Sequence, residues 1–132
     1  MNREQKYIKA ELVINLLKNG QPIINFDIYG EIKFSSDNYW ENKVIFDNCT
    51  IEEFTSFITF HKKVKFINCH FKKKCLFIST YFIDGLFIDK CLFDNYIDFQ
   101  AGGHNQNGSS IIISNNTFKG FVNFFDCWYE SE

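Results

Sequence analysis

The side chains of this 132-residue chain that could carry out chemistry are those of its three histidines and five cysteines. His61, His70 and His104 lack a metal-ligand spacing such as H-x-x-x-H. We therefore expect no catalytic residue, no metal ion and no cofactor. The cysteines are odd in number and form no C-x-x-C pair, so we expect small apolar core residues rather than disulfides or a zinc site at Cys49, Cys69, Cys75, Cys91 and Cys127.

Lysines gather in residues 61–65 and 70–74, and they form a candidate anion patch of Lys62, Lys63, Lys65, Lys72, Lys73 and Lys74. A basic patch can attract phosphate groups or nucleic acids. The chain as a whole has 14 basic and 16 acidic residues, and its net charge of −2 gives no long-range attraction to polyanions. Aromatic residues do not alternate with these lysines as they do in readers of single strands, which further disfavours nucleic acid as a partner.

A polar, glycine-rich stretch at residues 102–110 contains the third histidine. It lacks the Lys-Ser/Thr ending and the following helix of a phosphate-binding loop. We expect a mobile loop that projects from the body of the protein. Projecting loops often carry recognition, so the candidate recognition residues are His104, Asn105, Gln106 and Asn107.

The elements that position these residues must bury an unusual number of large rings, because 17 residues are Phe and one is Pro. The length suits one domain. Charged residues interrupt the first twenty positions, unlike a signal peptide, and no stretch is long and apolar enough for a membrane span. We expect a soluble cytoplasmic protein that does not enter a membrane.

A repeat of about 20 to 25 residues organises the chain. Phenylalanines recur at intervals of 23, 20, 22 and 25 residues, at Phe34, Phe57, Phe77, Phe99 and Phe124. Six positions before them lie the apolar residues Ile28, Ile51, Phe71, Phe93 and Phe118. Short apolar-x-apolar steps of period two predict strands. The fold class is therefore all-β, a right-handed parallel β-helix (solenoid) of about five coils over residues 21–132.

Asparagines and cysteines occupy the turns of this repeat. Asn tolerates left-handed backbone geometry, and stacked Asn side chains can form a hydrogen-bonded ladder; the expected corner holds Asn25, Asn48, Asn68 and Asn115. The same stacking places the two lysine groups on neighbouring turns. It also aligns Lys72 with Glu52 and Asp94, so that opposite charges alternate as surface ion pairs.

Residues 1–20 differ in kind from the repeat. Ile8, Leu12 and Leu16 recur at helical spacing. A capping box of Asn2 and Gln5 would begin the helix, and Asn19-Gly20 would end it. We expect an amphipathic helix that covers the first coil, because exposed strand edges would otherwise invite aggregation.

Several apolar side chains fall at positions that should point outward in three columns. Contiguous exposed apolar surface marks interfaces, although the helix or local distortion of a coil could also cover these residues. The candidate protein interface consists of Ile45, Phe87, Ile112, Ile58, Ile78, Phe125, Phe54, Tyr96 and Phe121.

The segments around Cys49, Cys69 and Cys91 resemble pentapeptide repeats, as Phe46-Asp-Asn-Cys49-Thr-Ile51 and Phe66-Ile-Asn-Cys69-His-Phe71 illustrate. Proteins of that family repeat a large apolar residue every five positions with a small residue two before it. The resemblance implies a right-handed quadrilateral β-helix without catalytic residues that acts through its surface or by dimerisation. Some members mimic a DNA duplex and inhibit type II topoisomerases, a role that requires a long acidic rod.

Four functions follow as hypotheses. The first is a non-catalytic protein-binding or scaffold module that acts through a solenoid face, including by homodimerisation. The second is an inhibitor or immunity protein that occludes a target enzyme or toxin. A nucleic-acid binder or DNA mimic, dependent on Lys72 to Lys74, and an enzyme built on His104 are the remaining alternatives.

Overall fold

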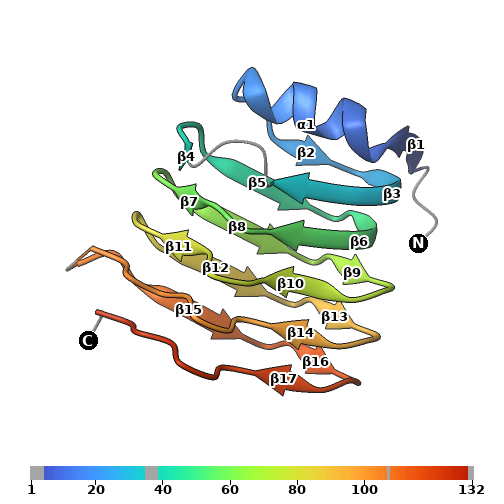
Figure 1. The fold of residues 1–132 in the computed structure, drawn as a ribbon. Helices are drawn as coiled ribbons and strands as arrows, with labels where there is room; N and C mark the ends of the chain where they lie inside the picture. Colours follow the sequence, from blue (N-terminus) through green and yellow to red (C-terminus); the bar gives the residue numbers. More distant parts are fainter. Residues whose placement is uncertain (1–4, 35–38, 107, 131–132) are drawn as a thin grey trace.

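The computed structural model describes residues 5–34, 39–106 and 108–130 and is a parallel β-solenoid of about five coils. Figure 1 shows the coils stacked from the blue N-terminal end to the red C-terminal end, with helix α1 (Ala10–Lys18) over the first coil. The expectation of a β-solenoid with about five coils and an N-terminal helix is confirmed. We number the coils one to five, over residues 23–40, 44–60, 64–82, 86–103 and 111–128.

Three parallel sheets run along the solenoid, and each coil adds strands to them in turn. Sheet B holds β2 (Ile23–Ile24), β5 (Val44–Asp47), β8 (Val64–Ile67), β12 (Leu86–Asp89) and β15 (Ile111–Ser114). Sheet C holds β4 (Tyr39–Trp40), β7 (Thr59–Phe60) and β11 (Tyr81–Phe82), and isolated bridges continue it through Gly103 and Trp128. Sheet A holds β1 (Lys6–Lys9), β3 (Phe26–Phe34), β6 (Thr50–Ser56), β9 (His70–Phe71), β10 (Cys75–Phe77), β13 (Leu92–Phe93), β14 (Ile97–Asp98), β16 (Thr117–Phe118) and β17 (Val122–Asn123).

Phenylalanine rings fill the interior, where the same residue of successive coils lies in register. The predicted column of Ile28, Ile51, Phe71, Phe93 and Phe118 is confirmed by the strand pairing. The rings of Phe71 and Phe93 stack with centroids 4.6 Å apart. Burial of each such side chain contributes roughly 1.5–3 kcal/mol, and the fully buried rings are Phe46, Phe54, Phe60, Phe66, Phe71, Phe77, Phe82, Phe93 and Phe99.

The predicted phenylalanine column is wrong in coil two. Ser56, not Phe57, pairs with Phe34 and with Phe77, and the Phe57 side chain is 60% exposed. The cause is one residue fewer between Ile51 and Phe54 of coil two, which β3 absorbs as a bulge between Ile28 and Glu31. The sequence conceals the deletion, because Phe57 lies one position after Ser56 and suits the column equally well.

The same deletion turns Phe54 inward. Its ring is fully buried and lies between those of Phe34 and Phe77, at centroid distances of 5.6 and 5.2 Å. It therefore fills the space that a ring at position 56 would have occupied. The hydroxyl of Ser56 is left within 2.8 Å of the Thr80 hydroxyl, a buried polar pair in the interior.

The asparagine corner follows the prediction. The φ angles of Asn25, Asn48, Asn68 and Asn115 lie between 52° and 63°, the left-handed region that Asn tolerates. The amide of Asn48 donates to Asn25 Oδ1 at 2.7 Å, and that of Asn68 donates to Asn48 Oδ1 at 3.1 Å. Lys90 takes the fourth position with the same backbone geometry and interrupts the ladder.

The cysteines next to this corner are buried and free, as expected of structural residues. Cys49, Cys69 and Cys91 donate to a backbone oxygen of the preceding coil, at Ile23, Phe46 and Phe66 respectively. Asn116 makes the equivalent bond in coil five. Burial raises the pKa of the Cys69 thiol, which keeps it protonated as a donor. Among the described residues, no group of His, Cys, Asp or Glu could hold a metal ion.

The N-terminal segment differs from the predicted helix over residues 1–20. Residues 6–9 form strand β1, which pairs with β3, and the helix begins only at Ala10 after an extended Lys9 without a side-chain cap. Asn2 lies outside the described residues, and Gln5 donates to the Asn48 carbonyl instead of capping a helix. The N-terminal half is a strand because the otherwise free edge of β3 supplies it with backbone partners.

Helix α1 covers the first coil, as expected, but with a different stripe of residues. Ala10, Val13 and Leu17 are buried, whereas Leu12 of the predicted stripe is 52% exposed. The helix ends at Lys18, where Gly20 with a φ of +76° donates to the Leu17 carbonyl. Within the described ranges, no helix is long and apolar enough to cross a membrane.

Candidate functional site

Coil five exposes two large apolar side chains whose counterparts in coil four are buried. Phe118 and Phe124 are 36% and 45% exposed, although their counterparts in coil four, Phe93 and Phe99, are each 1% exposed. We call the exposed set of this coil the coil-five surface, and it consists of Ile112, Phe118, Phe121, Phe124, Phe125 and Trp128.

The backbone edge of coil five lies beside these rings. Strands β15, β16 and β17 are the last members of their sheets, so one side of each strand has no neighbouring strand in the structure (Figure 1). The opposite end of the solenoid differs, because β1 pairs with β3 and α1 packs over the first coil. The first coil also has strand edges without a neighbouring strand beside exposed rings, at Tyr7 of β1 and Tyr39 of β4, but coil five combines such edges with the largest set of exposed apolar side chains of any coil.

The nine predicted interface residues differ in their exposure from coil to coil. Phe54 and Ile58 of coil two are buried, so their assignment to an outward surface is wrong. The reason is that coil two lacks one residue before Phe54 and another between Ser56 and Thr59, compared with coil three. Four more are half-buried: Ile45, Ile78, Phe87 and Tyr96. The three that are exposed, Ile112, Phe121 and Phe125, all belong to coil five.

Sequence reasoning missed Phe118, Phe124 and Trp128 as surface residues. Phe118 and Phe124 occupy the inward columns of the repeat, and their rings stack on Phe93 and Phe99 with interplanar angles of 9° and 3°. Their exposure arises because no described coil lies beyond them. No pattern within the repeat distinguishes them from buried residues.

Hydrogen bonds of the last described residues hold coil five against coil four. Trp128 donates its backbone N–H to the Gly102 carbonyl and accepts from the N–H of His104 at 2.6 Å. The Cys127 thiol donates to the Phe99 carbonyl at 2.9 Å. Burial raises the pKa of the Tyr129 hydroxyl, whose ring meets that of Phe124 edge to face. Coil five is therefore held in the same register as the buried coils.

The glycine-rich stretch at residues 102–110 is fastened to its neighbours. Asn105 is buried, and its amide donates to the Ser109 carbonyl and accepts from the N–H of Glu130. His104 packs edge to face on Tyr81, and the N–H of Gln106 donates to the Ile83 carbonyl. Asn107 lies outside the described residues. Asn105 thus ties the loop down, while the side chains of His104 and Gln106 remain exposed.

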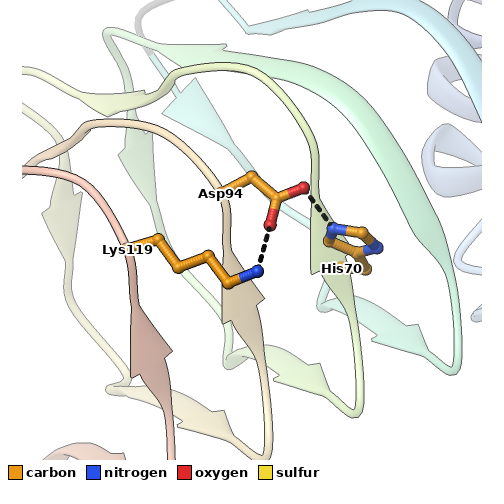
Figure 2. Close-up of polar contacts among 3 residues, drawn as sticks. All are labelled: His70, Asp94 and Lys119. Carbon is orange, nitrogen blue, oxygen red and sulfur yellow. Dashed lines mark hydrogen bonds and ion pairs between the residues drawn. The ribbon is translucent and has the colours of Figure 1, made fainter.

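An alternating column of charges crosses sheet A, but the partners of Glu52 and Asp94 in its ion pairs are other residues than the predicted Lys72. His70 Nε2 lies 2.6 Å from Asp94 Oδ2, and Lys119 Nζ lies 3.8 Å from Asp94 Oδ1 (Figure 2). The hydrogen bond from His70, and then the charge of Lys119, hold the pKa of the Asp94 carboxyl below its ordinary value. In the neighbouring coil Lys73 pairs with Glu52 at 3.4 Å.

The six lysines of the candidate anion patch do not form one surface. Residues 64–67 belong to sheet B and residues 70–71 to sheet A, so the two lysine groups lie on different sheets at coil three rather than on neighbouring turns. Lys73 is paired with Glu52. Lys63 and Lys65 instead line a groove on sheet B.

Comparison of the chain with protein-family models, with curated proteins and with solved structures finds no significant match. The stacked parallel coils place the chain in the class of β-solenoid proteins. They are also consistent with the pentapeptide-repeat fold that the sequence resembles.

Proposed function

We propose that this chain is a non-catalytic protein-binding module that associates through the coil-five surface with a second copy of itself. The observation that carries the proposal is the concentration of exposed apolar side chains in coil five, beside strand edges without neighbours. Exposed apolar surface of this kind marks interfaces.

A second copy suits the surface because the flat phenylalanine rings of one molecule can pack against those of another. Inside the solenoid, the rings of Phe99 and Phe124 stack with centroids 4.8 Å apart, and those of Phe93 and Phe118 stack 5.1 Å apart. The same rings of another molecule would cover the free faces of Phe118 and Phe124. It would also offer backbone groups to β16 and β17.

The helix over the first coil determines whether such an association forms a closed dimer or a filament. A head-to-tail contact would bring the coil-five surface against α1, whose outward face carries Glu11, Asn15 and Lys18. The pairing of two identical surfaces about a two-fold axis buries both of them and leaves no site for a third copy. We therefore expect a closed dimer and not a filament.

Light scattering coupled to gel filtration, over a hundredfold range of concentration, tests the proposal. The 132-residue chain should elute with twice its own mass of 15.7 kDa at the higher concentrations. Phe125→Glu should shift the chain to the monomer, because it places charge on the coil-five surface, where the Phe125 side chain is 68% exposed.

Phe57→Glu is the matched control. Phe57 follows Ser56 and Phe125 follows Phe124, so both take the same place in their coils, and Phe57 is 60% exposed. The control should leave the dimer intact. A wild-type chain that stays monomeric over the whole range, or equal behaviour of the two variants, contradicts the proposal.

A further inference from the structure

A groove on the outer face of sheet B shares Ile112 with the coil-five surface, but its other residues are different and have their own chemistry. Its volume is about 370 Å³, and strands β8, β12 and β15, which lie side by side in Figure 1, form its floor with the end of the 102–110 loop as one wall. The side chains that matter below are Lys63, Lys65, Asp84, Phe87, Ser109 and Ile112.

Strand register sets the basic and apolar parts of the groove next to each other. Lys65 pairs with Phe87, and Phe87 pairs with Ile112, so these three side chains lie side by side on the outer face. Lys63 is two positions before Lys65 and therefore faces the same side. One end of the groove is cationic, and a flat apolar strip leads away from it.

Gly85 lies in the floor of the groove and packs against the backbone of the 102–110 loop. Its φ is +94°, and a Cβ atom at this position would lie 2.6 Å from the carbonyl oxygen of Ser110. Any other residue would therefore have to displace this backbone, so glycine keeps the loop wall close to the floor.

The two lysines of the groove make no ion pair with any described residue, in contrast to Lys73 and Lys119. Asp84, the acidic side chain of the groove, accepts a hydrogen bond from the Ser109 hydroxyl at 3.2 Å. Lys65 is half-buried, with Ile45 and Phe87 on either side of it in the sheet. The groove therefore presents two ammonium groups without protein counter-ions beside an aromatic ring.

We propose that this groove binds a small molecule that joins an anionic head, such as a phosphate monoester or sulfonate, to a planar apolar body. The head is held by Lys63 and Lys65 through charge-assisted hydrogen bonds, and the body packs on Phe87 and Ile112. Neither half of the groove would suffice alone, because separate surface lysines bind anions weakly and the apolar strip is short.

Amide chemical shifts of the ¹⁵N-labelled chain, titrated with 1-naphthyl phosphate, test this inference. Shifts should concentrate on the amides of Lys65, Gly85, Phe87 and Ser110 and should saturate. Inorganic phosphate and 2-naphthol, each carrying half of the probe, should bind at least about tenfold more weakly, since each loses one set of contacts.

Lys65→Gln should raise the dissociation constant of the probe roughly tenfold, the effect of one lost charge-assisted hydrogen bond. Lys63→Gln, at a more exposed position, gives an independent check should Lys65→Gln disturb the strand. Lys33→Gln is the matched control, because Lys33 is an exposed lysine on the outer face of β3; it should leave the affinity unchanged.

The inference is overturned if the shifts fall on residues 117–128 of coil five instead, if they spread over the surface without saturation, or if neither groove lysine affects the affinity. The titration is repeated with the Phe125→Glu chain, whose coil-five surface is altered. The groove should bind the probe equally well there, so the site and the dimer can fail independently.

Discussion

Coils four and five carry the same pattern of residues and stack with the same geometry, yet one is core and the other is surface. Phe93 and Phe99 are buried, whereas Phe118 and Phe124 expose more than a third of their area. Ring stacking and strand register are therefore properties of the repeat, because each coil stacks its rings on the coil before it and pairs its strands with that coil. Burial depends on the next coil as well, and that neighbour is what coil five lacks among the described residues.

The largest expected effect is a loss of stability when a stacked phenylalanine ring of coil four is removed. Phe99→Ala should destabilise the chain by about 3–5 kcal/mol, because it leaves a cavity between two stacked rings. Phe124→Ala should cost less than about half as much, since its ring contacts a coil on one side only. Urea unfolding at a concentration that keeps both variants monomeric measures the difference, and equal losses would refute the distinction.

The next effect concerns Ser56, the one member without a ring in the column that it shares with Phe34 and Phe77. Ser56→Phe should cost about 1–3 kcal/mol, because Phe54 already fills the space between Phe34 and Phe77. Phe57→Ser, one position later on the outer surface, should change stability by less than about 0.5 kcal/mol. Thermal melts of the two variants decide whether coil two has the register described above.

Substitutions at the asparagine corner should change the stability of the chain by smaller amounts. Lys90→Asn should stabilise the chain by about 1 kcal/mol, since it keeps the left-handed backbone at a more tolerant residue and extends the ladder from Asn68. Asn68→Ala should destabilise by about 1–2 kcal/mol, because Ala disfavours this geometry. Paired urea titrations give both values, and a destabilising Lys90→Asn would show that the ladder does not extend past coil three.

The smallest expected effect lies in the surface charges of Figure 2. The pKa of Asp94 is lowered in the folded chain, so its carboxylate stabilises the fold above the ordinary value of 3.8. This stabilisation is lost as the pH falls through the lower folded value. The urea midpoint of Asp94→Asn should lie below that of the wild type at pH 7, and the gap should shrink as the pH falls below 3.8. A gap that does not change with pH would assign the effect to packing instead.

Much of the fold could be predicted because each coil repeats the same physical requirements. The Asn column needs left-handed turns, and the alternating strands need an inward face, so both are visible in the sequence. The shorter coil two was missed, since Phe57 mimics the residue type of its column. Residues 6–9 were assigned to the helix because their strand partner, β3, lies about twenty positions away in the sequence.

The candidate sites were less predictable than the fold. Exposure of Phe118 and Phe124 depends on what lies beyond them in space, which residue types do not encode. The groove brings Lys63 together with Ser109 across two coils, and the sequence groups Lys63 instead with Lys72 to Lys74, on another sheet. Lysine spacing along the chain therefore predicted a charge cluster but not its partners.

The bulge in β3 shows how this architecture can vary its exterior without altering its interior. Between Ile51 and Thr59, coil two is two residues shorter than coil three between Phe71 and Tyr81. This shortening brings Phe54 inside and Phe57 outside, while Ile51 and Thr59 keep their places in the sheets. Only the short stretch between those two positions changes which side chains meet the solvent. Insertions and deletions confined to one turn would thus let new surface chemistry arise within an unchanged stack of rings.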